Sequence, residues 1–228
     1  MKTSNIIIFS FLIFLFGGIT LLYIGSKYYK EVNYSDDFAN QEKIVAPFSV
    51  IVAEPGASFH LKNGKEYKIL QNYKKVTVSN FAPFVVRNDT LFMFAIKPGR
   101  IKEESSVVPV VFCKNVKYII GKENADVYLD NYGADSLFVN IKKAKLSWVY
   151  DKIVFVSLNA KNSSVSLNGN NLEKIDLKLD KAKVNITSEK SIESISGSLK
   201  NASDLNCSVD GRLNLEVDKS SKMYLGNN

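Results

Sequence analysis

The chain has little histidine, cysteine or tryptophan: its 228 residues include one His, two Cys and one Trp. A zinc centre of Cys and His ligands needs more of both, and two cysteines cannot form the disulfide framework of a small secreted domain. Charged residues make up 23% and hydrophobic residues 46% of the chain, which is ordinary globular usage and excludes a disordered chain. We predict a folded protein without metal or other cofactor.

The amino-terminal segment lacks charge. No charged residue lies between Thr3 and Ser26, and residues 6–24 are almost all aliphatic or aromatic, enough to cross a hydrocarbon core of ~30 Å. We predict a transmembrane anchor within residues 1–26, with a signal peptide as the alternative. A short tail before a lone anchor usually stays in the cytoplasm. We therefore expect a single-pass protein with residues 27–228 outside it, in the periplasm or at the cell surface.

Residues 27–43 are polar, show no sustained periodicity and are expected to form a linker. From Ile44 onward, short alternating runs rich in Val, Ile and Phe are separated by turn residues such as Asn-Gly, which is typical of β-strands. Beyond the anchor, no stretch of ten or more residues shows the apolar spacing of a helix. We predict an all-β protein, with residues 44–115 as an N-terminal β-segment of the head domain.

Residues 116–228 contain a repeat. Two alternating strands recur, and the second strand of each unit has two apolar inward positions at spacings of 19, 19, 19, 21 and 18 residues. These positions are Val127 and Leu129, Leu146 and Trp148, Val165 and Leu167, Val184 and Ile186, Leu205 and Cys207, and Met223 and Leu225. A period this short is typical of a solenoid in which each coil hydrogen-bonds to its neighbours. We predict a right-handed parallel β-solenoid of about 19 residues per coil.

The first strand of each unit recurs in the same order. Its expected inward residues are Tyr118 and Ile120, Val139 and Ile141, Val156 and Leu158, Leu177 and Leu179, Gly197 and Leu199, and Leu215 and Val217. Small residues precede the second strand and are expected to stack at a corner: Ala125, Ala144, Ser164, Ala182, Ser203 and Ser221.

Three stretches carry a resemblance to a known family: PFSVIVAEPGASFHLKNGKEYKI, VRNDTLFMFAIK and IDLKLDKAKVNITSEKSIESISGSLKNASDLNCSVDG. Over about residues 44–226 the chain resembles the bacterial autotransporter adhesins with a head GIN domain. It differs in having one Ile-Ser-Gly-Ser phrase, at residues 195–198, where relatives repeat it. The resemblance implies a β-domain of the cell envelope or surface, with adhesion as the suggested role.

Candidate catalytic groups are sparse. His60 lies in an alternating strand and is expected to be a solvated strand residue rather than a ligand or base. Asp176, Asp204 and Glu216 are expected to face outward, but the aligned positions of neighbouring coils carry Asn, Ser or Lys. Because no stack of acids results, we predict no catalytic residues and no enzyme. A polysaccharide-acting β-solenoid enzyme is the alternative.

The two cysteines and the tryptophan are assigned to the core. Cys207 occupies an inward position and should behave as a small hydrophobic residue. A disulfide between Cys113 and Cys207 is the alternative if the compartment is oxidising. Trp148 is expected to be core rather than a ligand platform.

The net charge of +7 comes mostly from Lys dispersed along the chain, so nucleic acid is not an expected partner. The expected partners are the membrane and an envelope polysaccharide or surface protein. Exposed aromatic rings can stack on either, and the candidate binding residues are Phe138, Phe155, Tyr128 and Tyr150. Alternatively, the N-terminal β-segment packs over these rings.

Overall fold

The computed structural model describes residues 16–20, 38–74, 83–96, 108–190 and 192–226. The chain divides into two compact units, residues 1–39 and 40–228. In the first unit the described structure begins with a short helix at residues 16–20, and no helix in the described ranges has the length and apolarity to cross a membrane. Most of the predicted anchor and linker lies outside the described residues, so both stay predictions.

The described chain folds into strands that join in one sixteen-stranded sheet. The strands are β1 (Phe38–Ile44), β2 (Val50–Ala53), β3 (Ser58–Asn63), β4 (Lys68–Lys74), β5 (Phe84–Arg87), β6 (Thr90–Met93), β7 (Val110–Cys113), β8 (Tyr118–Gly121), β9 (Asp126–Asp130), β10 (Ala134–Lys142), β11 (Lys145–Lys161), β12 (Ser164–Asp180), β13 (Lys183–Ser188), β14 (Ile192–Lys200), β15 (Asp204–Val217) and β16 (Lys222–Gly226).

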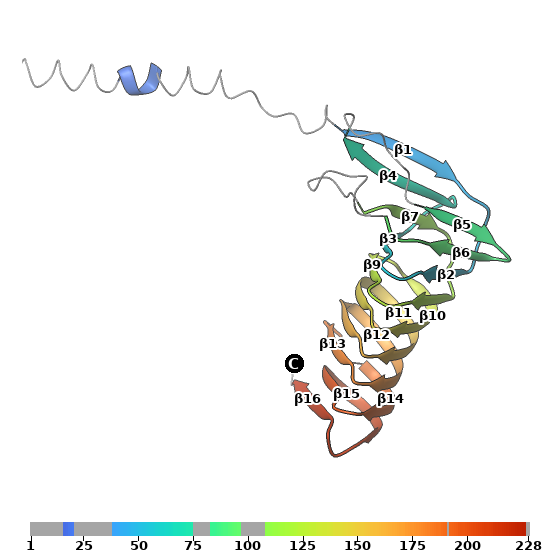
Figure 1. The fold of residues 1–228 in the computed structure, drawn as a ribbon. Coiled ribbons are helices and arrows are strands. Elements are labelled where there is room, and N and C mark those ends of the chain that lie inside the picture. The colour runs from blue at the N-terminus through green and yellow to red at the C-terminus, as the bar shows by residue number, and fades with distance from the viewer. Residues whose placement is uncertain (1–15, 21–37, 75–82, 97–107, 191, 227–228) are drawn as a thin grey trace, which may run out of the picture. The chain divides into compact units, whose positions relative to one another are not determined.

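The sheet is wound into coils, and parallel pairing between coils builds two walls (Figure 1). The first ladder contains β6, β2, β8, β10, the second halves of β11 and β12, β14 and the second half of β15. The second ladder contains β7, β3, β9, the first halves of β11 and β12, β13, the first half of β15 and β16. The predicted parallel β-solenoid of about 19 residues per coil is confirmed, with about six turns.

The second ladder has the register that the repeat predicts. Leu146 pairs with Val127 on one side and Val165 on the other, and the series continues without a slip to Met223. The inward residues of this ladder are buried as far as Cys207, so apolar side chains of successive coils stack into one continuous core.

The first ladder differs from the expected alignment in two coils. Val139 pairs with Ile119, not with its neighbour Tyr118, so Ile119 is buried and Tyr118 is 46% exposed. Val139 also pairs with Leu158 on the next coil, whereas Val156 pairs with Leu137. Alternation within a strand fixes which residues share a face, but the register between strands depends on the turns and on packing. The sequence pattern alone therefore left these two coils misaligned.

Small buried residues stack at the tight turn that leads from the first ladder into the second. They are Ala125, Ala144, Ser163, Ala182 and Ser203. The expected member Ser164 is wrong: Ser163 is buried, and Ser164 begins β12 with an exposed side chain. The turn needs a residue with positive φ just before the small one, and Asn162 (φ 49°) supplies it there.

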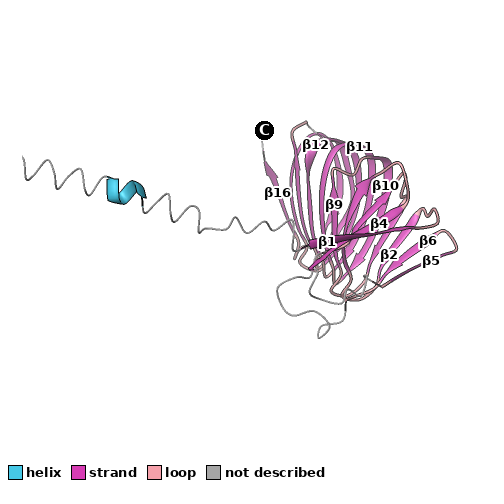
Figure 2. Cartoon of the chain, turned by 90° about the horizontal axis from the view of Figure 1, so that it is seen from above, coloured by secondary structure: helices cyan, strands magenta, loops and turns pink. Residues whose placement is uncertain are grey.

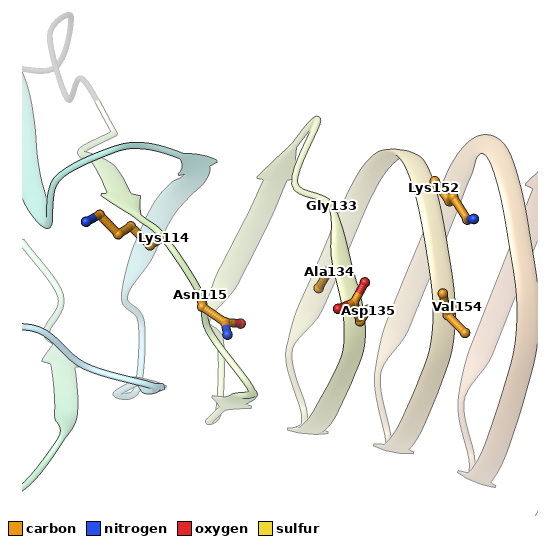
Figure 3. Close-up of a pocket in the computed structure, with 7 residues that line it drawn as sticks. All are labelled: Lys114, Asn115, Gly133, Ala134, Asp135, Lys152 and Val154. Atoms are coloured by element: carbon orange, nitrogen blue, oxygen red, sulfur yellow. The ribbon is translucent and has the colours of Figure 1, made fainter.

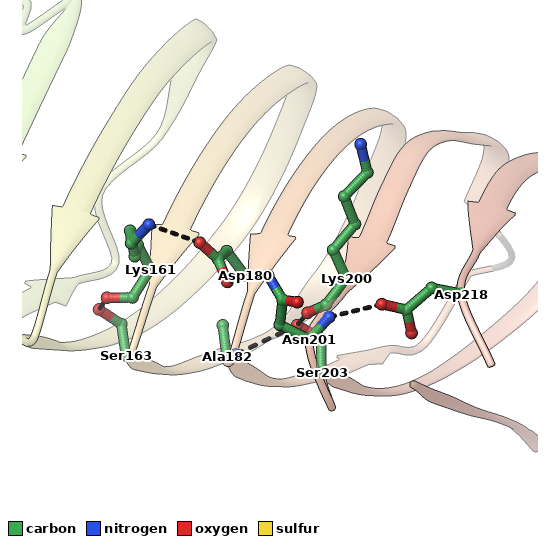
Figure 4. Close-up of polar contacts among 8 residues, drawn as sticks. All are labelled: Lys161, Ser163, Asp180, Ala182, Lys200, Asn201, Ser203 and Asp218. Carbon is green, nitrogen blue, oxygen red and sulfur yellow. Dashed lines mark hydrogen bonds and ion pairs between the residues drawn. The ribbon is translucent and has the colours of Figure 1, made fainter. Parts of the chain in front are cut away.

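Polar side chains link successive turns along the same edge (Figure 4). Lys161 forms an ion pair with Asp180 (2.6 Å), whose carboxylate also accepts a hydrogen bond from Asn201 Nδ2 (2.8 Å). The backbone N–H of Asn201 donates to Asp218 (2.6 Å), so the contacts continue to the last turn. The hydrogen bonds that Asp218 accepts from the Asn201 N–H and from Ser221 and Ser220 hold its pKa well below its usual range.

The coil stack extends into residues 44–115. β8 and β9 pair with β2 and β3, and on their far side β2 and β3 pair with β6 and β7. Antiparallel strands lie beyond: β5 on β6, and β4 on β7, with β1 next to β4. Figure 2 shows the ladders as one continuous curved array. The ladders thus cross the predicted boundary after residue 115.

Both cysteines are buried and free. The disulfide alternative is therefore wrong: Cys113 ends β7 at one end of the stack, while Cys207 lies in β15 near the other. Burial raises the pKa of the Cys113 thiol to about 12 and that of Cys207 to about 11. Trp148 is a core residue, as predicted, and its indole N–H donates to the carbonyl of Tyr132 (2.8 Å).

Candidate binding surface

Three aromatic side chains form a row on the outer face of the first ladder: Tyr118 on β8, Phe138 on β10 and Phe155 on β11. Tyr118 and Phe138 are cross-strand partners, and their rings stack with centroids 5.0 Å apart. Phe155 meets Phe138 edge to face at 6.1 Å. Tyr118 is 46% and Phe138 37% exposed. This aromatic row therefore presents ring surface to solvent on a regular sheet, which holds its geometry without a loop.

The environment changes along this face. Towards β6 the neighbours are mostly apolar, with half-buried Ile120 and Phe92 and exposed Val85. One cation is present there: the Arg87 guanidinium lies 4.6 Å from the Phe92 ring centroid. Towards the other end the row that contains Phe138 becomes polar. It continues as Ser157, Asp176, Ser196 and Asn214. The aromatic row lies where an apolar region meets a polar one.

Tyr128 lies apart from the aromatic row, on the outer face of the second ladder. Its ring stacks on His60 at 4.8 Å. His60 Nδ1 is 2.8 Å from an Asp130 carboxylate oxygen, and Lys62 Nζ is 3.6 Å from the same oxygen. His60 is thus a half-buried, paired residue rather than a freely solvated one. Sequence patterns alone do not indicate this pair, because Asp130 is 70 positions away in the chain.

Tyr150 does not reach the surface. It is 2% exposed, packs edge to face against Trp148 at 5.9 Å, and its hydroxyl donates to the Thr187 carbonyl at 3.5 Å. Burial raises its pKa. The expectation that it lies outward is wrong, and the strand pattern could have shown this. Tyr150 has the same parity as Leu146 and Trp148, which point inward.

Tyr118 is a binding-surface residue that the sequence does not reveal. Its alternation with Ile120 underlies the expectation that both face inward, yet the same parity is equally consistent with the outward face. Only its pairing with Phe138 places it outward. Phe138 and Phe155 lie on the predicted face, and residues 44–63 extend the stack end-on beside them rather than covering them.

Two surface pockets are lined by residues other than the three rings of the aromatic row. The first, of about 460 Å³, lies where the β7–β8 connection passes the start of β10, and is lined by Lys114, Asn115, Gly133, Ala134, Asp135, Lys152 and Val154 (Figure 3). Lys114 and Lys152 lie at opposite ends of it, with Asp135 between them. The second, of about 450 Å³, lies on the outer face of the second ladder and includes Lys183, Asp204 and Tyr224.

The acidic residues do not converge. Asp176 faces out from the first ladder and accepts a hydrogen bond from Ser196 (3.3 Å), whereas Asp204 belongs to the second ladder. Glu216 pairs with Ser198, in a different row from Asp176. Across the residues that the structure describes, no group of three or more His, Cys, Asp or Glu side chains is placed to hold a metal ion.

Comparisons with known proteins bear on the fold. No family model and no curated protein matches the chain. A solved structure from Bacteroides fragilis, named a "putative adhesin", is similar at 14% identity and a TM-score of 0.50, covering 84% of this chain and 97% of its own. A "putative adhesin" from Parabacteroides distasonis is 9% identical with a TM-score of 0.44, covering 83% of this chain and 94% of its own. A "putative lipid binding protein" from the same species is 12% identical with a TM-score of 0.37, covering 83% of this chain and 97% of its own. The first likeness shows a shared fold.

Proposed function

We propose that this chain is a membrane-anchored β-solenoid that acts outside the cytoplasm as a binding, adhesion or structural module of the bacterial envelope. The observation that carries the proposal is the aromatic row, whose exposed rings lie on a rigid, broad sheet. The name of the Bacteroides fragilis protein with the same fold agrees with this role, as does the resemblance to the GIN-domain adhesins. The anchor would hold the head domain at the membrane.

The proposed partner is an envelope polysaccharide or a surface protein. Aromatic rings contribute apolar contact area and stack against sugar rings or apolar side chains. The Ser, Asp and Asn residues that continue the Phe138 row would supply hydrogen bonds along an extended ligand. The alternative of a polysaccharide-acting enzyme needs acids facing one bond, whereas Asp176, Asp204 and Glu216 lie in separate rows.

A binding assay tests the proposal. The full chain in detergent micelles is titrated with purified envelope polysaccharides and surface proteins. The wild type should bind saturably without turning over the ligand, and the Tyr118→Ser/Phe138→Ser variant should lose at least about tenfold in affinity, because stacking contributes ~1 kcal/mol or more per ring. Tyr128→Ser tests the candidate ring on the other ladder: unchanged affinity would confine the site to the aromatic row, and a comparable loss would extend it to the second ladder. Product release would favour the enzyme instead.

Anchoring is tested separately in cells. The full chain should sediment with membranes and resist alkaline carbonate, and a C-terminal tag should be open to protease added outside the cytoplasmic membrane. A chain lacking residues 1–26 should be released from the membrane fraction. A protected tag would contradict the proposed orientation, and release of the full chain by carbonate would contradict the anchor.

A further inference from the structure

Within the described residues, the last coil leaves its edges unpaired and part of its core exposed. Among the described strands, residues 212–217 of β15 pair with β14 on one side only, and β16 pairs only with β15. Inward-facing residues of this coil are exposed where their counterparts in earlier coils are buried: Leu213 by 38%, Val217 by 41% and Leu225 by 47%. An edge strand with unpaired backbone groups and an apolar face is a template for another strand.

The sequence of this edge is self-complementary. Residues 212–216 read Arg-Leu-Asn-Leu-Glu, with outward Arg212 and Glu216 placed symmetrically about Asn214. In an antiparallel pair of two copies centred on Asn214, Arg212 of each copy faces Glu216 of the other. Leu213 then faces Leu215. Opposite charges and apolar residues directly across an antiparallel ladder are stabilising.

The other open edge, β16, is compatible with the twofold axis that would pass through the Asn214 pair. β16 reads Lys-Met-Tyr-Leu-Gly, with apolar Met223 and Leu225 placed symmetrically about Tyr224. The turn at residues 218–221 joins the two edges, so Asn214 lies three residues before the end of β15 and Tyr224 two residues after the start of β16. Asn214 and Tyr224, the central residues of the two edges, are thus separated from the turn by similar numbers of residues. One twofold axis through the two walls can pair both edges at once.

We propose that two copies of this chain associate end to end through their last coils, by antiparallel pairing of residues 212–217 and of β16 about one twofold axis. Such a closed interface uses the same patch on both copies. It joins the two hydrophobic cores and satisfies the open backbone groups of both edges. The aromatic rows then belong to one rigid dimer, and a partner with repeated epitopes would meet two binding surfaces.

Charge reversal tests the interface without touching the core. Oligomeric state is measured for the full chain in detergent micelles by sedimentation equilibrium over a wide concentration range. Arg212→Glu alone, or Glu216→Arg alone, places like charges together twice per dimer and should raise the dimer dissociation constant by about tenfold or more. The double variant Arg212→Glu/Glu216→Arg restores opposite charges and should recover dimerisation. Both residues are exposed, so folding should not change.

A cysteine at the axis tests the register. In Asn214→Cys the two new thiols are direct neighbours across the pair, where Cβ atoms lie ~4.5–5.5 Å apart, and mild oxidation should give a covalent dimer. Asn159→Cys, exposed on the same ladder three coils earlier, should form no covalent dimer under oxidation, although its non-covalent dimer should persist. The native thiols are buried and should not compete.

A wild-type chain that is monomeric at every concentration overturns the proposal. So does a dimer that ignores the charge reversals and gives no Asn214→Cys cross-link, because it must use another surface, such as the anchor. Capture of a foreign strand by a monomeric last coil would identify a different occupant and would also overturn it.

Discussion

The hydroxyl of Ser163 accepts a hydrogen bond from the backbone N–H of Ala144, one coil earlier, at 3.2 Å. It also donates to the Lys161 carbonyl at 2.7 Å, so one buried side chain fastens two neighbouring turns. Ser203 makes the same pair of contacts, with the Ala182 N–H (3.2 Å) and the Lys200 carbonyl (2.7 Å). The stack of small residues thus serves as both a packing and a hydrogen-bonding column.

Ser163→Ala should lower the free energy of unfolding by about 1–2 kcal/mol, because it leaves the buried N–H of Ala144 without an acceptor, whereas the Lys161 carbonyl still accepts from the Lys143 N–H. Chemical denaturation measures the change. Ser164→Ala is the control, since the Ser164 side chain is exposed and its loss should change stability by less than about 0.5 kcal/mol. Equal effects of the two substitutions would contradict the assigned turn register.

Truncating the aromatic side chains should separate surface from core. Phe138→Ala should lower the free energy of unfolding by only about 1–2 kcal/mol, because the residue is already 37% exposed. Tyr150→Ala should cost about 3–5 kcal/mol, because it empties a large buried site beside Trp148. Denaturant midpoints measured for both variants check the assignment. A loss of free energy of unfolding in Phe138→Ala as large as that in Tyr150→Ala would show that the Phe138 ring is covered in solution.

Gly197 is the position least tolerant of a side chain on the first ladder. Its φ is +127°, and a Cβ there would lie 1.8 Å from the Leu177 carbonyl oxygen. Gly197→Ala should therefore destabilise the protein by about 3 kcal/mol or more, through backbone strain and displacement of the neighbouring coil. Ser198→Ala, the adjacent control, should be nearly neutral. Thermal melting of the two variants tests the expectation, and a Gly197→Ala melt like the wild type's would refute it.

Alkaline pH should destabilise the fold through the buried thiols. Burial raises the pKa of Cys113 from 9.0 to about 12, so the unfolded chain releases this proton at lower pH than the folded chain. The stabilisation is complete below pH 9 and is lost as the pH rises from there towards 12. Burial also raises the pKa of neighbouring Tyr132, which acts in the same direction.

The denaturant midpoint should therefore fall as the pH rises from 8 to 11. The fall per pH unit should be smaller in Cys113→Ala than in the wild type. At pH 8 neither cysteine of the folded protein should react readily with a thiol reagent, whereas both should react in denaturant. Fast labelling of the native protein would contradict the burial of these groups.

Much of the second ladder was predictable because its inward residues repeat with little insertion. The series from Val127 to Met223 fixes coil length, strand parity and the parallel stacking. The first ladder was less predictable, because β10 has more inward positions than the two assigned to each coil. Leu137 pairs with Val156, and choosing the wrong two positions shifts the register.

The candidate binding surface was predicted only in part. The outward placement of Phe138 and Phe155 follows from strand alternation. The same alternation places Tyr150 inward and excludes it from the surface. Tyr118 and the pairing of His60 with Asp130 could not be predicted, because they depend on which strands of distant coils lie side by side.

The sequence by itself determined the class of fold, the coil length and the inward set of the second ladder, because period-two alternation at a near-constant spacing permits few other structures. The tertiary structure alone decided the register of the first ladder, the exposure of Tyr118 and the stacking of β2, β3, β6 and β7 onto the solenoid. The physical reason is that a strand presents the same backbone donors and acceptors at every second residue. Local sequence therefore selects the face, while the neighbouring coil selects the partner.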